Sequence, residues 1–208
     1  MSVAQQERAI RTRQVLLLAA ASVFDEVGYD AASISEILSR SKMTKGALYF
    51  HFASKEALAL GVIDAQTADL ELPETGSKLQ DLVCLTQSIA RRLQTDVLLR
   101  AGVRLTVEER TLNLLGASQA SPYAKWIEIC GGLLTESKAN GELLGHVQPA
   151  AVAELVVASF TGIQLVSQVY SRREDLAERL SAFWRYLLPG IAVPGVLPHL
   201  TTDPPAAG

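Results

Sequence analysis

The sequence predicts an all-α protein of about nine helices. Apolar residues recur at intervals of three and four along most of the 208 residues, which is the spacing of helices that bury one face. Serine, threonine and proline stand where these stretches begin, and glycine or proline stands where several of them end. No stretch alternates apolar and polar residues clearly enough to predict a strand. Hydrophobic residues make up 49% of the chain, which is ample for a helical core.

The first helix is expected over residues 5–27. Leu16, Ala20 and Phe24 are spaced four residues apart and should lie on its buried side. Gly28 follows as the residue that ends the helix, because glycine adopts the left-handed backbone of a C-terminal cap without strain.

Two short helices are expected next, over residues 33–40 and 44–52, in the layout of a helix-turn-helix. Ser33 and Glu36 have the spacing of a capping box, and Thr44 is the expected N-cap of the second short helix. Leu48 and Phe52 should face inward, which leaves the opposite side of that helix exposed.

The later helices are expected from similar signals. Ser54 opens a helix that should reach about Leu72, where Pro73 and Gly76 interrupt the chain. Further helices are expected over residues 77–94, 97–109, 122–139, 149–170 and 176–188. Residues 112–120 should form a loop, and the proline-rich C-terminal end should be a loose tail.

The second short helix has the composition of a helix that reads DNA in the major groove. From residue 31 to 55 four basic residues stand against one acidic residue, although the whole chain has a net charge of −3. A structural role for His51 and a merely solvated Lys55 are equally open. Base contacts are expected from Thr44, Lys45, Ala47 and Tyr49, and phosphate contacts from Arg11, Arg13, Ser33, His51 and Lys55.

Other classes of protein find little support in the sequence. The three histidines fall in separate segments without a carboxylate at metalloprotease spacing. Cys84 and Cys130 have no spacing partner, so neither a zinc site nor a disulfide framework is expected. The longest uncharged run, residues 155–171, is short and contains several polar residues, so a buried or interface helix is expected rather than a membrane span. The expectation is a cytoplasmic protein that is not an enzyme and needs no cofactor.

The helix-turn-helix segment resembles a known family. Its residues Lys45-Gly46-x-Leu48-Tyr49-x-His51-Phe52-x-x-Lys55-Glu56 are similar to the signature of TetR-family transcriptional repressors. Ala47 and Phe50 within it, and later Pro122-Tyr123-x-x-Trp126 and Phe160-Thr161-Gly162, resemble the γ-butyrolactone receptor branch. The resemblance implies a DNA-binding domain over residues 1–52, a ligand-binding and dimerisation domain over 53–190, and a flexible tail over 191–208.

The resemblance adds Lys42 and Gly46 to the residues expected at DNA, and it has one departure. Many members of the family have Ala-Gly-Val at the turn where this chain has Ser41-Lys42-Met43. Glycine tolerates the positive φ common at such a turn, whereas lysine does not do so freely. Either the turn relaxes, or Lys42 accepts modest strain and places a cation beside the DNA.

Polar and aromatic residues on otherwise apolar helices are candidates for a ligand site. A buried polar group needs a partner, and a ligand is one such partner, although composition alone favours a place in the core for each residue. The resemblance favours a pocket for a small, mostly apolar lactone-like or furan-like signal, with Trp126 in a position characteristic of that branch. The candidates are Gln66, Gln87, Trp126, Phe160, Thr161 and Gln164.

The two long apolar helices near the C-terminus predict a homodimer, because they carry more apolar surface than one small domain buries alone. A two-fold dimer presents two reading helices to a near-palindromic operator in double-stranded DNA. The expected interface residues are Val156, Ser159, Gly162, Ile163, Leu180, Phe183, Trp184 and Leu187.

The preferred interpretation is a ligand-released repressor, implied by the resemblance to control secondary-metabolite genes. A TetR-like regulator that answers to an antibiotic or another apolar ligand is the nearest alternative. A binding protein that no longer contacts DNA is disfavoured by the basic residues at 42, 45 and 55. An all-α enzyme is disfavoured because no catalytic constellation is visible in the sequence.

Overall fold

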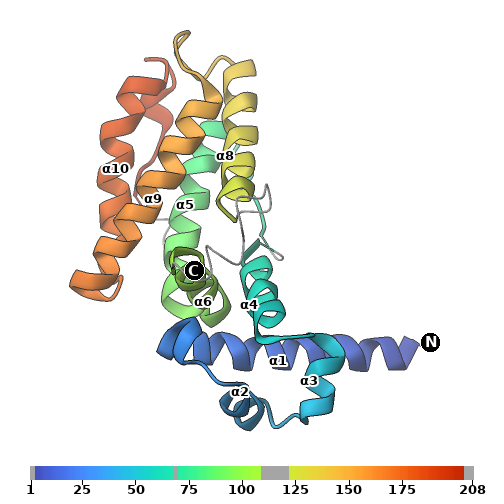
Figure 1. Cartoon of the computed structure of the whole chain (residues 1–208). Helices are drawn as coiled ribbons and strands as arrows, with labels where there is room; N and C mark the ends of the chain where they lie inside the picture. Colours follow the sequence, from blue (N-terminus) through green and yellow to red (C-terminus); the bar gives the residue numbers. More distant parts are fainter. Residues whose placement is uncertain (1–2, 68–69, 109–121, 204–208) are drawn as a thin grey trace. The chain divides into compact units, whose positions relative to one another are not determined.

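The computed structural model describes residues 3–67, 70–108 and 122–203. Within these ranges the chain forms nine α-helices and two short 3-10 helices, and the one β-bridge joins Leu143 to Ala192 (Figure 1). The all-α prediction is therefore confirmed. The loop predicted over residues 112–120 lies outside the described residues.

The described residues divide into two compact units. The first contains α1 (Val3–Ala31), α2 (Ile34–Ser41), α3 (Lys45–His51), α4 (Lys55–Asp64), η1 (Ala65–Thr67) and α6 (Val97–Val107). The second contains α5 (Lys78–Thr95), α8 (Pro122–Ala139), α9 (Pro149–Ser171), α10 (Leu176–Ile191) and η2 (Leu197–His199). Helix α6 therefore belongs to the same unit as α1 to α4, although α5 of the other unit lies between them in the sequence.

The first unit is built around α1. Leu16, Ala20 and Phe24 are fully buried, as their spacing predicts. Helices α2 and α3 lie on one side of α1, and α4 lies on the other (Figure 1). Ala101 and Leu105 of α6 complete the same core, so the reading helices share one hydrophobic cluster with α4 and α6.

Polar contacts fix the end of α1 to α6. The Arg100 guanidinium lies 2.8 Å from the Asp25 carboxylate, and the Glu108 carboxylate accepts the Tyr29 amide at 2.8 Å. Gly28 interrupts the regular helix with φ 78°, and a Cβ there would come within 2.5 Å of Glu108 Oε1. Glycine is needed at this position both for its backbone and for the space it leaves.

The predicted N-caps of the reading helices are present. Ser33 Oγ accepts the Glu36 amide at 3.1 Å, and Thr44 Oγ1 accepts the Ala47 amide at 3.1 Å. The reciprocal half of the first capping box is replaced, because the Glu36 carboxylate instead accepts from Arg40 Nε at 2.9 Å.

The second unit is a bundle in which α5, α8, α9 and α10 run alongside one another (Figure 1). Trp184 of α10 is fully buried and donates its indole N–H to Thr86 of α5 at 2.8 Å. The buried Glu142 carboxylate accepts the Leu79 amide at 2.8 Å and the Ser77 hydroxyl at 3.0 Å. A negative charge at the N-terminus of α5 satisfies amides that have no partner within the helix.

Two segments differ from their sequence-based expectation. Helix α4 ends at Asp64 and continues as η1 to Thr67, whereas a helix to about Leu72 was expected. The proline-rich segment after α10 is hydrogen-bonded to the bundle as far as Thr202. Thr201 donates its amide to Gln80 at 2.8 Å, and the Thr202 carbonyl accepts from Ser181 at 2.8 Å. Side chains of α5 and α10 supply these hydrogen bonds, and residue spacing does not reveal such partners.

Candidate nucleic-acid interface and ligand site

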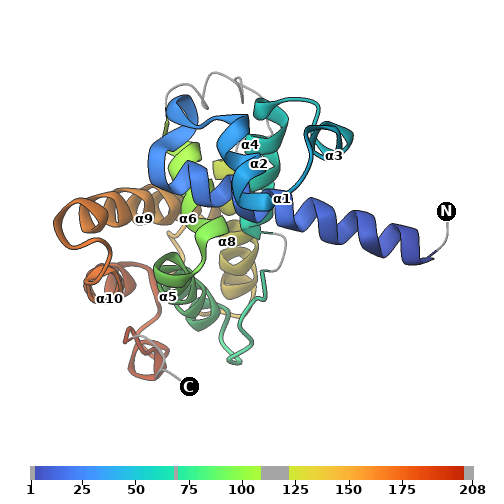
Figure 2. The ribbon, with the colours of Figure 1, turned by 90° about the horizontal axis from the view of Figure 1, so that it is seen from below.

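Helix α3 lies at the edge of its unit, with one side buried and one exposed (Figure 2). Leu48 is fully buried, whereas Tyr49 is 43% exposed. Thr44 and Lys45 are exposed and Ala47 is half-buried, so the four side chains predicted to read bases lie on the exposed side or its flanks. The structure thus leaves a helix surface open at the expected place.

Cation–π contacts hold several basic side chains near α3. The Arg13 guanidinium lies 5.1 Å from the centre of the Phe52 ring, and Lys45 Nζ lies 5.9 Å from the Tyr49 ring. Lys55 Nζ lies 4.5 Å from the centre of the Tyr29 ring. These contacts restrain the positive charges without neutralising them.

Arg40 differs from the other basic residues of the segment. Its Nη2 lies 2.8 Å from Glu26 Oε2, and its Nε lies 2.9 Å from Glu36 Oε1. The hydrogen bond from Arg40 holds the pKa of the Glu26 carboxyl below its ordinary value. The charge of Arg40 is therefore compensated within the chain, whereas Arg11, Arg13, Lys42 and Lys45 are exposed. Lys55 is half-buried and also donates from Nζ to the Asp30 carbonyl at 3.5 Å.

Several other residues predicted to contact DNA have local roles that leave their chemistry usable. The Ser33 and Thr44 hydroxyls accept amides as N-caps, and a hydroxyl that accepts can also donate to a phosphate oxygen. His51 is half-buried and meets the Phe50 ring edge-on at 5.1 Å between ring centres. Lys42 has φ 55° and ψ 27°, so the turn does not relax and the lysine accepts the left-handed backbone.

Three of the six predicted ligand residues, Gln66, Gln87 and Gln164, have hydrogen bonds within their own compact units. Gln66 is buried in the first unit, where its Nε2 donates to Thr106 Oγ1 at 3.4 Å. Gln87, in the second unit, is fully buried and donates to Ser181 Oγ at 3.1 Å. Gln164, in the same unit, accepts from Arg173 Nη2 at 3.2 Å. These amides have structural hydrogen bonds, although Gln87 Oε1 and Gln164 Nε2 have no hydrogen-bond partner among the described residues.

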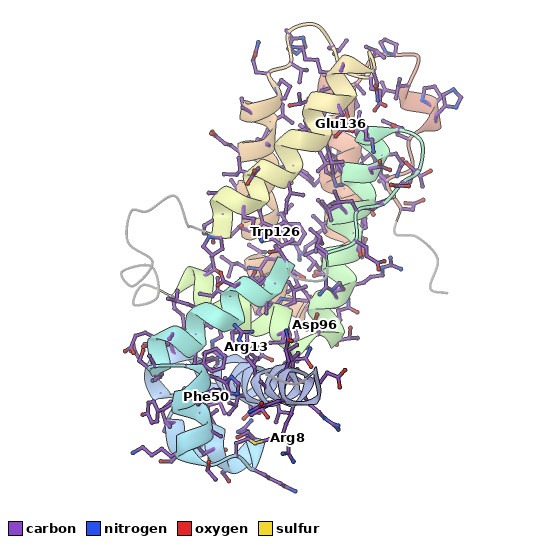
Figure 3. The ribbon with its side chains drawn as sticks, turned by 90° about the vertical axis from the view of Figure 1, so that its right-hand side faces the viewer. Arg8, Arg13, Phe50, Asp96, Trp126 and Glu136 are labelled. Carbon is purple, nitrogen blue, oxygen red and sulfur yellow. The ribbon has the colours of Figure 1, made fainter. Side chains whose placement is uncertain are left out.

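The structure does bring α8 and α9 side chains together in the second unit. The Tyr123 hydroxyl is hydrogen-bonded to Thr161, and burial raises the pKa of the Tyr123 phenol while that hydrogen bond acts in the opposite direction. Trp126 lies one turn further along α8 and points toward α5 (Figure 3). Phe160 is half-buried beside Thr161. Tyr123 was not among the predicted site residues, although its i, i+3 spacing from Trp126 places both on one face of α8.

The residues predicted for the dimer interface fall into two groups. Val156, Leu180 and Trp184 are buried within the single chain and belong to its own core, which differs from the prediction. Gly162 is exposed, and Ser159, Ile163, Phe183 and Leu187 are half-buried. The most exposed apolar side chains of the two helices are instead Val169, Tyr170 and Tyr186. Both helices have apolar residues on more than one side, so spacing alone did not identify the outer side.

The described residues contain no cluster of three or more potential metal ligands among His, Cys, Asp and Glu. Cys84 and Cys130 are free thiols, and burial raises the pKa of Cys130 to about 11. By length and composition, one helix among the described residues, α9, could cross a membrane. That is weak evidence, because an apolar core or interface helix meets the same criteria.

Comparison with known protein families gives two matches. Residues 16–62 match the family described as "Bacterial regulatory proteins, tetR family". Residues 76–194 match the family described as "Tetracyclin repressor-like, C-terminal domain". Together the two matches cover both compact units.

Individual proteins are similar over most of the chain. The A-factor receptor protein of Streptomyces griseus is 46% identical over 97% of this chain and 71% of its own length. The crystal structure of native TylP, a TetR regulator from Streptomyces fradiae, has 42% identity and a TM-score of 0.82, covering 96% of this chain and 87% of TylP. CprB from Streptomyces coelicolor, solved in complex with its biological operator sequence, has 30% identity and a TM-score of 0.73, covering 92% and 94% of the two chains.

Proposed function

Because this chain belongs to the tetR family of bacterial regulatory proteins, we propose that it is a repressor released from DNA by a small signal molecule. Membership of the family makes it a transcriptional regulator and not an enzyme. In the proposal it binds a near-palindromic operator as a homodimer and acts in the cytoplasm. A lactone-like or furan-like signal releases it, and the genes it controls serve secondary metabolism.

The DNA part of the proposal rests on the exposed side of α3 and on the basic residues near it. An α-helix fits the major groove, where Lys45 and Tyr49 would meet base edges. Arg11, Arg13, Lys42 and Lys55 would neutralise flanking phosphates, which fix the helix in place without reading sequence. The similar CprB was solved in complex with its operator sequence, which supports DNA binding by this chain.

The ligand part of the proposal rests on the α8–α9 cluster of Tyr123, Trp126 and Thr161. Two aromatic rings with adjacent hydroxyl groups suit a small ligand that has an apolar body and a few oxygen atoms. The similarity to the A-factor receptor supports a γ-butyrolactone as the first compound to test. The Gln66 amide donates to Thr106 at 3.4 Å, so the proposal does not assign it a hydrogen bond to the ligand.

Release would follow from a difference in affinity between two dimer states. Two reading helices must stand about 34–36 Å apart to enter successive major grooves. A ligand that favours another spacing weakens DNA binding, and DNA weakens ligand binding by the same coupling free energy, typically ~1–3 kcal/mol.

The experiment begins by selecting an operator from random duplex DNA with the wild-type protein and then adding γ-butyrolactones to the complex. We expect release of the wild type, whereas Trp126→Ala should bind the operator normally and remain bound when the lactone is added. Trp126 is half-buried, so its truncation should leave the fold intact. Release of Trp126→Ala at the same lactone concentration as the wild type would show that the ligand binds elsewhere.

Tryptophan fluorescence gives an independent control, because the chain has only two tryptophans, Trp126 and the fully buried Trp184. Lactone should quench the fluorescence of Trp184→Phe, which retains Trp126, and should leave Trp126→Phe unchanged. If lactones have no effect while apolar antibiotics release the operator, the chain answers to the alternative class of ligand.

A further inference from the structure

Phe50 is an exposed aromatic side chain on the reading helix, and the proposed function gives this side chain no role. It is 81% exposed, roughly twice as much as its neighbour Tyr49 at 43%. Among the described residues its ring contact is the edge-on one with His51, with 5.1 Å between ring centres. A phenyl ring this open offers an apolar contact to whatever binds the exposed side of α3.

Helix geometry places Phe50 at the outermost position of α3. With 3.6 residues per turn, a residue two positions from the buried Leu48 lies about 200° around the helix, on the opposite side. Gly46 lies opposite Leu48 by the same reasoning and is one turn before Phe50. A Cβ at Gly46 would meet only Thr44 Oγ1, at 4.0 Å, so the helix surface beside Phe50 is open.

One flank of this line has the cationic Lys45 and the polar Tyr49, the other has Ala47, and the line itself carries no polar side chain. Lys45 and Tyr49 contact each other on one flank, with Lys45 Nζ 5.9 Å from the Tyr49 ring. A phenyl ring cannot donate or accept the hydrogen bonds that most base edges offer in the major groove. The thymine 5-methyl group is the apolar feature of that groove, and phenylalanine is one of the side chains that suit it.

We propose that Phe50 determines sequence specificity by packing against the 5-methyl group of a thymine in the operator. The inference rests on the proposed function, in which α3 enters the major groove. The absence of a side chain at Gly46 lets the helix backbone come close to the base pairs, so that the ring one turn later reaches the methyl group. Specificity at that base pair then comes from an apolar contact. It adds to the specificity that the hydrogen bonds of Lys45 and Tyr49 provide.

The test replaces each thymine of the selected operator in turn with deoxyuridine, which differs only by the missing methyl group. For the wild type, affinity should fall about fourfold at the contacted thymine, the factor expected when one buried methyl group is lost. Phe50→Ala should bind the intact operator at least about tenfold more weakly, because a whole aromatic contact is removed. It should also show no further loss with deoxyuridine at that position. Circular dichroism checks that the variant is folded.

Tyr49→Ala is the matched control, since it truncates the adjacent aromatic residue of the same helix. It should bind more weakly and still lose about fourfold with deoxyuridine at the same position. The inference is overturned if Phe50→Ala keeps the deoxyuridine penalty, or if it weakens operator and random DNA equally. If the wild type selects no DNA sequence at all, the proposed function fails and this inference fails with it.

Discussion

At the scale of single residues, Lys42 combines a backbone cost with a functional charge. Its φ of 55° lies in the left-handed region, which costs an L-residue about 1–2 kcal/mol. Glycine avoids that cost, although its greater conformational freedom in the unfolded chain lowers the free energy of unfolding by about 0.5–1 kcal/mol. The exposed ammonium group lies in the turn directly before α3, where a phosphate contact is proposed.

We therefore expect Lys42→Gly to raise the free energy of unfolding by about 0.5–1 kcal/mol, the difference between these two effects. The same variant should bind DNA more weakly, with a salt dependence reduced by about one phosphate contact. Urea denaturation and operator titrations at several salt concentrations measure the two effects. Lys42→Ala is the control: it keeps the left-handed strain, so it should lose DNA affinity without gaining stability. A stability gain of equal size in both variants would contradict the strain argument.

The sequence predicted residue-scale features best where the partner is close in the chain. Ser33, Thr44 and Ser54 are N-caps because each hydroxyl accepts an amide three residues later. Arg40 was counted as a free cation, and it is paired with Glu26, fourteen residues away on α1. No spacing rule connects those two residues, because their proximity depends on how α2 packs against α1.

At the scale of elements, η1 follows α4 and is in contact with α6. Gln66 turns into α6, and the position of a Cβ on Gly102 would be only 2.4 Å from Gln66 Cγ. Glycine is therefore required at position 102 because Gln66 occupies the space of a Cβ, and not because of the backbone conformation of residue 102. The sequence predicted most helix starts from local caps, whereas Gln66, just after the end of α4, packs against Gly102, a residue 36 positions away.

We predict that Gly102→Ala destabilises the chain by about 1–3 kcal/mol, the usual cost of forcing extra volume into a packed core. Elsewhere in a helix this change would stabilise by up to about 1 kcal/mol, because alanine is the better helix former. In a Gln66→Ala background the obstructing side chain is gone, so Gly102→Ala should become neutral or stabilising. Urea denaturation of the four proteins in this cycle measures the coupling. An equal loss in both backgrounds would show that Gln66 is not the obstacle.

At the scale of the whole molecule, packing groups the helices differently from the sequence motifs. The sequence predicted a DNA-binding domain that ends at residue 52, a boundary set by the end of the motif. The compact unit around α3 also contains α4 and α6, because these helices share its hydrophobic core. A motif marks the residues that recognise DNA, whereas a packing unit depends on contacts between distant segments that one sequence does not reveal.

The exposed side of α9 and α10 is the strongest indication of an assembly. Val169 is 80% exposed and Tyr186 is 83% exposed, although most of α9 is apolar. In the most apolar stretch of α9, only 22% is buried within the single chain. A two-fold pairing of these helices would cover the same surface on both copies, which is how closed dimers form.

We predict that the wild type is a homodimer at micromolar concentration, with about twice the 22.4 kDa mass of one chain in light scattering. Val169→Glu and Tyr186→Glu should each give folded monomers that no longer bind the full operator, because an unpaired charge cannot be buried at the interface. These positions are exposed in the single chain, so the variants should fold, whereas a charge at the fully buried Leu180 would disrupt the core itself. Leu72→Glu is the matched control, since Leu72 is 48% exposed and lies outside α9 and α10, and it should remain dimeric. A wild-type particle of only 22.4 kDa, or dimers that persist in both glutamate variants, would rule out this interface.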